Sequence, residues 1–251
     1  MRIVAITQAR TGSSRLPGKV LKEIHGMTLL QLHLTRVLGS KLIDQLMVAT
    51  TILPEDKSIV AIADTLSIRC YQGSVDDVLD RFYKSVEGDN IDFIVRLTSD
   101  CPLIDPGLID KVIQYAINLN LDYCSNTLVP TYPDGQDVEV FKYSALEKAW
   151  MEAKLPSERE HVTPYIWKNS TFKGGSIFTS GNFTEQYTLG HLRMTVDEPA
   201  DFEVIKNLID AIGIDGSWID YANWLDKDEK TKQLNRSIAR NEGYNRSTNK
   251  E

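Results

Sequence analysis

Apolar residues along the first two-thirds of the chain follow two alternating patterns. Short runs that are mostly apolar predict buried strands at 2–6, 45–50, 68–71 and 92–97. Apolar residues three and four positions apart predict helices at 29–38, 59–66, 75–86 and 106–118. Such alternation is typical of an α/β fold, a mostly parallel sheet with helices on both faces. Ligands of these sheets bind beyond the carboxyl ends of the strands.

The pattern is less regular after residue 138. Further strands are predicted at 138–141, 172–178 and 192–196, and further helices at 144–153, 160–167 and 200–212. From residue 226 the chain is polar, and we expect a solvated helix that runs into a frayed tail. We therefore predict one domain over 1–225, with a subdomain at about 130–195, and a polar C-terminal helix or tail over 226–251.

Composition narrows the class of protein. The chain has 251 residues, of which 42% are hydrophobic and 25% charged, so it can bury a core without disulfides. The net charge of −7 argues against nucleic acid as the main partner, although not against a nucleotide. No apolar run has the length of a signal-peptide core or a membrane span. Three widely spaced cysteines are expected to be reduced core residues of a cytoplasmic protein: Cys70, Cys101 and Cys124.

The segment 7–19 (TQARTGSSRLPGK) follows the first predicted strand and is rich in glycine and basic residues. Gly12 and Gly18 allow unusual dihedral angles, and successive backbone N–H groups in such a loop can bind an anion. The spacing excludes a Walker A loop, because five residues separate the glycines and no Ser or Thr follows the lysine. We interpret the segment as a phosphate-binding loop rather than a merely solvated one. Its three cations are Arg10, Arg15 and Lys19.

The stretch from Ile6 (ITQARTGSSRLPGKVLKEIHG) resembles the signature of the cytidylyltransferase family that includes CMP-Kdo and CMP-sialic acid synthetases. It is most similar to the branch named after the spore coat polysaccharide biosynthesis protein F. Gln8 departs from the pattern, because the Kdo and sialate enzymes usually have proline there. The resemblance extends at least to Ile205 and implies a Rossmann-like sheet of the glycosyltransferase-A type. It implies that the loop wraps a triphosphate through Ala9, Arg10, Thr11, Gly12, Ser13, Arg15 and Lys19.

Two aspartates lie next to predicted strands. Asp100 (RLTSDCPLID) follows the strand 92–97, and Asp197 (MTVDEP) precedes the last helix of the domain. The residues alone also allow a turn or the start of a helix at both positions. The resemblance implies that both bind Mg²⁺, which takes one or two protein carboxylates beside phosphates and water. It also implies that Arg10, Lys19 and Asp100 are catalytic.

The remaining candidates each keep a structural alternative. Ser74 and Asp77 resemble the family's segment near the base, but they are equally a helix capping box. Arg96, also assigned to the nucleotide, and Thr98 replace residues that are more often amides, so the choice of CTP rests on the resemblance. The sugar is assigned to Asp137 and Glu139, which share a face of an extended segment, and to Arg159 and His161. Their alternatives are a solvated acidic loop and contacts at the start of a helix.

The resemblance implies transfer of CMP from CTP to a sugar or sugar acid, with release of pyrophosphate, for surface polysaccharide or glycan synthesis. Mg²⁺ is the expected cofactor, and a homodimer is expected from the family, with acceptor and dimer contacts in the subdomain. One alternative is a glycosyltransferase of the same fold, which usually carries D-x-D where this chain has Thr98-Ser99-Asp100. The other is a non-catalytic binding subunit, against which the joint presence of Arg10, Lys19, Asp100 and Asp197 argues.

Overall fold

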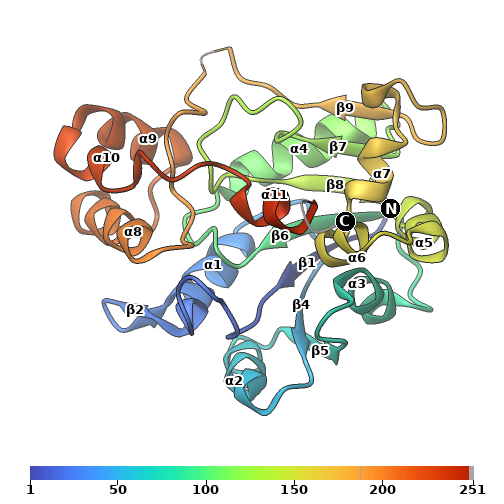
Figure 1. Cartoon of the computed structure of the whole chain (residues 1–251), viewed down its shortest axis with the longest axis horizontal. Coiled ribbons are helices and arrows are strands. Elements are labelled where there is room, and N and C mark those ends of the chain that lie inside the picture. Colours follow the sequence, from blue (N-terminus) through green and yellow to red (C-terminus); the bar gives the residue numbers. More distant parts are fainter. Residues whose placement is uncertain (187, 249–251) are drawn as a thin grey trace.

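A seven-stranded sheet forms the centre of the molecule (Figure 1). The structure is a computed structural model that describes residues 1–186 and 188–248. The strands follow the order β5-β4-β1-β6-β8-β7-β9. Their bounds are β1 Ile3–Gln8, β4 Gln45–Thr51, β5 Arg69–Gly73, β6 Phe93–Thr98, β7 Tyr123–Ser125, β8 Glu139–Lys142 and β9 Ser180–Asn182. A separate two-stranded ribbon consists of β2 Glu23–Ile24 and β3 Met27–Thr28.

Strand direction divides the sheet into two parts. β1 pairs in parallel with β4 and β6, and β5 extends this part on the far side of β4. β8 is antiparallel to both β6 and β7, and β9 is parallel to β7. The carboxyl ends of the four parallel strands therefore lie along one edge, where α/β sheets bind ligands.

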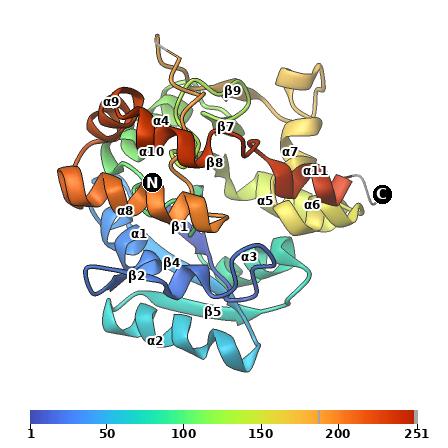
Figure 2. The ribbon, with the colours of Figure 1, turned by 60° about the vertical axis from the view of Figure 1, so that its left-hand side comes forward.

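Alternate residues of the central strands enter two different cores. In β1, Ile3 and Ala5 belong to one hydrophobic cluster, and Val4 and Ile6 belong to the other. The first cluster holds helices α1 Leu29–Val37, α2 Lys57–Thr65, α4 Pro106–Asn118, α8 Pro199–Ile212 and α9 Trp218–Lys227. The second holds α3 Val78–Val86 and α5 Tyr143–Glu152. The sheet is thus covered on both faces, as Figures 1 and 2 show.

A buried histidine ties the first helix to the sheet. His33 of α1 lies 2.9 Å from the Thr7 hydroxyl and 2.9 Å from the backbone oxygen of Cys101. Burial lowers the pKa of His33 to about 4, so the ring is neutral at neutral pH. The contact keeps the segment after β6 beside the end of β1, where the candidate residues lie.

The structure confirms the predicted mostly parallel α/β sheet but corrects its later part. Residues 172–178 and 192–196 are not strands; they contribute isolated bridges at Phe178 and Arg193, and 171–173 form the 3₁₀ helix η3. The predicted helix 160–167 is two helices, α6 Pro156–His161 and α7 Pro164–Lys168. They are separated at Val162, whose φ of 71° is incompatible with a continuous helix.

The C-terminal segment is more ordered than its polar composition predicts. It forms α10 Glu229–Asn235 and α11 Glu242–Thr248, and the predicted tail also includes residues 249–251, which lie outside the described residues. Thr231 and Asn235 of α10 are buried against α8. Within 1–186 and 188–248, no helix is both long and apolar enough to cross a bilayer.

Candidate active site

A buried aspartate holds the loop that links β1 to the 3₁₀ helix η1 (Lys19–Leu21). Asp56 accepts hydrogen bonds from the Thr11 backbone N–H at 2.8 Å and from the Thr11 hydroxyl at 2.7 Å. Burial would raise the pKa of Asp56, but hydrogen bonds from Thr51 and Thr11 hold it below its ordinary value. Gly18, with φ of 66°, donates its N–H to the Thr11 oxygen at 2.9 Å. The predicted nucleotide residue Thr11 is therefore the residue on which the loop is fixed.

Lys19 joins the two predicted metal ligands. Its Nζ lies 3.2 Å from Oδ2 of Asp100 and 2.9 Å from Oδ1 of Asp197. It also donates to the backbone oxygen of Val196 at 2.8 Å. Burial alone would lower the pKa of Lys19, but the two carboxylates raise it above its ordinary value. The side chain is therefore a charged ammonium ion at neutral pH.

Asp100 is a charged carboxylate at the end of β6. Burial would raise its pKa, but attraction by Lys19 and hydrogen bonds from Thr98, Lys19 and Cys101 hold the pKa of Asp100 far below its ordinary value. Its side chain is 28% exposed, so the carboxylate remains accessible to a ligand.

Asp197 lies beside Asp100 because the chain before α8 crosses the end of β6. The Val196 N–H donates to the backbone oxygen of Asp100 at 2.8 Å. Two guanidinium groups contact the Asp197 carboxylate, Arg15 Nη2 at 3.0 Å and Arg193 Nη2 at 3.1 Å. Within 192–196, Arg193 makes an isolated bridge to Asp134 and Val196 bonds to Asp100, and the segment does not pair as a strand of the main sheet.

Asp201 stabilises the start of α8. It is fully buried and accepts hydrogen bonds from the backbone N–H groups of Asp197 and Glu198, at 2.9 and 3.0 Å. Pro199 is the first helical residue, one position before the predicted start at residue 200. Asp197 itself is directed at Lys19 and Arg15, and it is free of the capping role that its sequence position also allowed.

Two carboxylates that converge on one ammonium group form a donor set that fits Mg²⁺. In the described part of the chain, no group of three or more His, Cys, Asp or Glu could hold a metal ion. Mg²⁺ commonly takes one or two protein carboxylates and completes its shell with phosphate oxygens and water. Asp100 and Asp197 would therefore hold such an ion together with the phosphates of a nucleotide.

Asp137 follows a turn that only glycine allows. Gly135 has φ of 102°, and a Cβ there would lie 2.5 Å from the backbone of Met194. The Asp137 carboxylate accepts a hydrogen bond from Nη2 of Arg240 at 2.5 Å. Burial raises the pKa of Asp137 to about 7, against the attraction of Arg240 and with a contribution from neighbouring carboxylates.

Glu139 and Arg96, assigned from the sequence to the sugar and to the nucleotide, are paired with each other. Glu139 is buried, forms an ion pair with Arg96, and accepts hydrogen bonds from the hydroxyls of Tyr123 and Thr163, each at 2.6 Å. Arg96 also donates to Oε1 of Gln8 at 3.2 Å. In this structure the pair joins β6 to β8 beneath the site.

Ser74, Asp77 and Arg159 have structural roles here. Asp77 is the N-cap of α3 and accepts from the Asp80 N–H at 2.9 Å, whereas Ser74 accepts from the Asp77 N–H at 3.1 Å. The predicted capping box is therefore wrong, because the helix begins three residues later than Ser74 would place it. Arg159 donates to Asp77 at 2.7 Å and to two backbone oxygens at the end of α5, which fits its structural alternative.

His161 faces the C-terminal helix. Its Nε2 lies 3.1 Å from the Ser247 hydroxyl, and its ring meets that of Tyr244 edge to face at 5.2 Å. Burial lowers the pKa of His161, and repulsion by Arg96 and Arg10 adds to the effect. Arg10 itself is exposed, two residues beyond the end of β1.

A sequence model of the cytidylyltransferase family matches residues 4–242 of the chain. The chain belongs to the cytidylyltransferase family. An uncharacterised protein of Methanocaldococcus jannaschii, MJ1063, is 38% identical over 95% of this chain and 96% of its own. The spore coat polysaccharide biosynthesis protein SpsF of Bacillus subtilis is 33% identical over 84% of this chain and 88% of its own.

A solved cytidylyltransferase from Leptospira borgpetersenii has the same fold. It is 32% identical, and the superposition has a TM-score of 0.86 and covers 93% of this chain and 97% of that one. The family and the nucleotidyltransferase fold expected from the loop signature are therefore confirmed. The roles of single site residues remain predictions, to which the structure of this chain adds geometry.

Three arginines of this chain lie at the site without having been assigned to it from the sequence. Arg81 is buried, and burial together with repulsion by Arg10 lowers its pKa to about 10. Arg193 and Arg240 hold the carboxylates of Asp197 and Asp137. Arg81 lies in the segment that resembles the family, but Arg193 and Arg240 have no local signal, because distant segments define their contacts.

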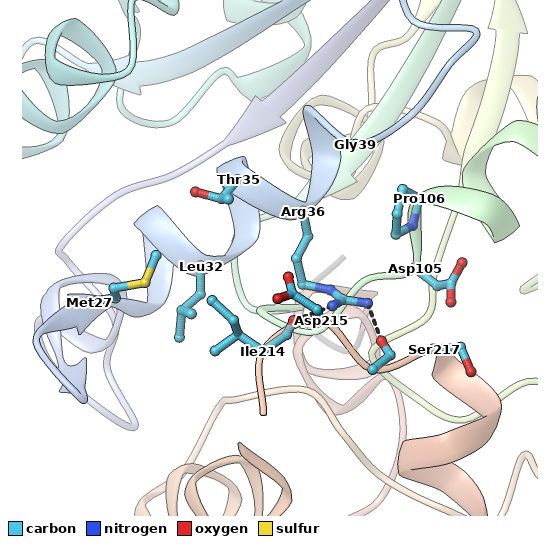
Figure 3. Close-up of a pocket in the computed structure, with 11 residues that line it drawn as sticks. Met27, Leu32, Thr35, Arg36, Gly39, Asp105, Pro106, Ile214, Asp215 and Ser217 are labelled. Carbon is cyan, nitrogen blue, oxygen red and sulfur yellow. Dashed lines mark hydrogen bonds between the residues drawn. The ribbon is translucent and has the colours of Figure 1, made fainter. Parts of the chain in front are cut away.

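The chain also has a cavity of about 240 Å³ between α1, the start of α4 and the segment 214–217 (Figure 3). Arg36 reaches into this region and donates to the backbone oxygens of Ile104, Ile214 and Gly216. Because backbone oxygens engage each nitrogen of its guanidinium group, Arg36 acts here as a structural link between α1 and α9. The cavity contains none of the predicted site residues.

Proposed function

We propose that this protein is a Mg²⁺-dependent nucleotidyltransferase that transfers CMP from CTP to a sugar or sugar acid and releases pyrophosphate. The observation that carries the proposal is the convergence of Lys19, Asp100 and Asp197, at 3.2 and 2.9 Å, beside a basic loop at the carboxyl end of β1. The relationship to SpsF supports a role in surface polysaccharide or glycan synthesis.

The loop would bind the triphosphate. Lys19 and Arg15 now neutralise Asp100 and Asp197, and a metal ion that took these carboxylates would let both cations contact phosphate oxygens. Arg10 is exposed beside them and supplies a third positive charge. These groups neutralise the developing charge of the leaving pyrophosphate, which is the main way a protein accelerates such a transfer.

The acceptor would bind on the side of Asp137. In the reaction, an acceptor oxygen forms a bond to the α-phosphorus, the bond to the bridging oxygen of pyrophosphate breaks, and the hydroxyl proton is released. Mg²⁺, held by Asp100 and Asp197, would polarise the α-phosphate and make the attacking hydroxyl more acidic. Asp137 can accept a hydrogen bond from a sugar hydroxyl when charged.

The test is thermal unfolding with Mg²⁺ and CTP, UTP, GTP, ATP or dTTP in turn. A ligand that binds the folded protein at 100 times its Kd stabilises it by about 2.7 kcal/mol, so the cognate nucleotide raises Tm by several degrees. We expect the shift with CTP, and its loss in Lys19→Ala and Asp100→Ala. Lys22→Ala is the matched control, since Lys22 is an exposed cation three residues beyond Lys19.

The same unfolding experiment also tests the alternative activity, a glycosyltransferase. A shift with a nucleotide sugar and with none of the triphosphates would overturn the proposal and indicate a glycosyltransferase. Where CTP binds, release of pyrophosphate with Kdo, sialic acid and related sugar acids identifies the acceptor class.

A further inference from the structure

The last described residues of the chain cross the candidate active site. We call residues 236–248 the C-terminal strap; it leaves α10, turns at Asn241 and ends in α11 beside α6 (Figures 1 and 2). Its start is fixed firmly, because Asn235 is buried and donates to Asp201 at 2.9 Å and to the Arg193 oxygen at 3.2 Å. Beyond that anchor, its contacts with the site are made mainly by charged and polar side chains.

One strap residue lies on the triphosphate side of the site. The carboxylate of Glu242 is 3.5 Å from Nη1 of Arg15, whose other nitrogen Nη2 contacts Asp197 at 3.0 Å. A metal ion would take Asp197 when a nucleotide binds, but it offers no compensation to Glu242. Phosphate oxygens bound to Arg15 would then lie beside the Glu242 carboxylate, and these like charges would repel each other.

A second strap residue lies on the acceptor side. Arg240 donates to Asp137 at 2.5 Å and to the Tyr132 oxygen at 3.2 Å, and its Nε lies 3.8 Å from Asp134. The Asp137 carboxylate, which would accept a hydrogen bond from a sugar hydroxyl, is already bound to the guanidinium group of Arg240. Arg240 and Glu242 are two residues apart, so one movement of the strap changes both contacts.

We propose that the C-terminal strap closes the ligand-free site by occupying charged groups of both subsites, and that triphosphate binding displaces it. Glu242 stands where an anionic phosphate would bind, and Arg240 covers an acceptor carboxylate. Release of Glu242 also withdraws Arg240, so the acceptor gains access to Asp137 only after the nucleotide has bound. The inference rests on the proposed function for the identity of the ligands.

The strap's contact on the triphosphate side is the weaker of the two. The side chains of Arg15 and Glu242 are 20% and 29% exposed and their charged atoms lie 3.5 Å apart, whereas Arg240 is 16% exposed and lies 2.5 Å from Asp137, so release begins at Glu242. The buried anchor at Asn235 stays in place, so the movement is a swing of 236–248 rather than unfolding of α10.

The first experiment measures amide hydrogen exchange of the full chain, alone and with Mg²⁺ plus CTP or Mg²⁺ plus inorganic pyrophosphate. We expect exchange over 240–248 to become about three- to fivefold faster on ligand binding, while α10 is unchanged. Slower or unchanged exchange over 240–248 in a protein that binds either ligand would overturn the strap and leave the proposed function standing.

The second experiment compares Glu242→Gln with Glu229→Gln. Both residues are the first residue of a short helix, but Glu229 pairs with Lys232, away from Arg15. We expect Glu242→Gln to bind pyrophosphate with Mg²⁺ about three- to fivefold more tightly, and Glu229→Gln to match the wild type. Equal or weaker binding in Glu242→Gln contradicts the proposal. Absence of binding of both ligands to the wild type and to Glu242→Gln would overturn the proposed function and the strap together.

Discussion

Two aspartates of the site differ in charge although both are surrounded by ionisable groups. Asp100 has a buried lysine within hydrogen-bonding distance, and its pKa lies far below the ordinary value. Asp137 has Arg240, yet burial and neighbouring carboxylates raise its pKa to about 7. At neutral pH, Asp100 is therefore a permanent anion, whereas Asp137 is divided between its two forms.

The raised pKa of Asp137 gives a dependence of stability on pH. The folded state holds this proton up to about pH 7, whereas the unfolded chain releases it near pH 4, so the contribution of Asp137 to folding falls as pH rises between these values. We expect the free energy of unfolding of wild type to fall relative to Asp137→Asn between pH 5 and pH 7.5. Urea unfolding at both pH values measures the difference, and parallel pH profiles would contradict the assignment.

The residues found from the sequence and those missed differ in how local their signal is. Asp100 closely follows the buried strand β6, and Lys19 ends the basic loop after β1, so periodicity and turn residues place both at one edge of the sheet. Asp197 was assigned through the resemblance to the family, since its position alone equally allows the start of a helix, and the strand predicted before it does not form. Arg240 was missed because it lies in a polar segment with no apolar periodicity. Its partner Asp137 is 103 residues away in the sequence.

At the scale of elements, the start of α3 shows how a local signal can be misplaced. Ser74 and Asp77 fit a capping box in the sequence, but the structure starts the helix at Val78, after Asp77. Asp77 then has two partners, the Asp80 N–H and Arg159 of α6. The cap therefore also joins α3 to α6, a tertiary contact that local sequence patterns do not contain.

Alanine substitution separates the two cap positions. We expect Asp77→Ala to lower the free energy of unfolding by about 1–2 kcal/mol, because it removes the N-cap and leaves Arg159 without its carboxylate. Ser74→Ala is expected to cost no more than about 0.5 kcal/mol, as its hydroxyl accepts one half-exposed N–H. Chemical denaturation measures both values, and the reverse order would place the cap at Ser74.

At the scale of the whole molecule, the parallel half of the fold follows from the sequence better than the other half. Strands β1, β4 and β6 are mostly apolar because both faces are buried. The three-residue strands β7 and β9 are too short for a periodic signal. The strand predicted at 172–178 does not form: Phe172 and Ile177 are partly exposed, and Phe178 is buried but makes only an isolated bridge.

Exposed apolar side chains bear on the expected homodimer. Met151, Phe172 and Ile177 are 62%, 38% and 44% exposed, and all lie in the subdomain expected to make dimer contacts. We expect sedimentation velocity to show a dimer, and Phe172→Glu together with Ile177→Glu to weaken it. Leu38→Glu is the control, since Leu38 is an equally exposed apolar residue at the end of α1, outside the subdomain. A wild-type monomer at micromolar concentration would refute the expectation.

The contacts of Lys19 also affect how the protein folds. Lys19 meets Asp100 across 81 residues and Asp197 across 178, and Glu242 reaches Arg15 from the far end of the chain. Closing such long loops is slow, because the chain loses conformational entropy before the stabilising contacts form. Helices and the β1–β4 pairing can therefore form on a nascent chain well before the site exists. Recovery of nucleotide binding during refolding should accordingly lag behind recovery of secondary structure, and an N-terminal fragment that ends before α8 should fold in part and bind nothing.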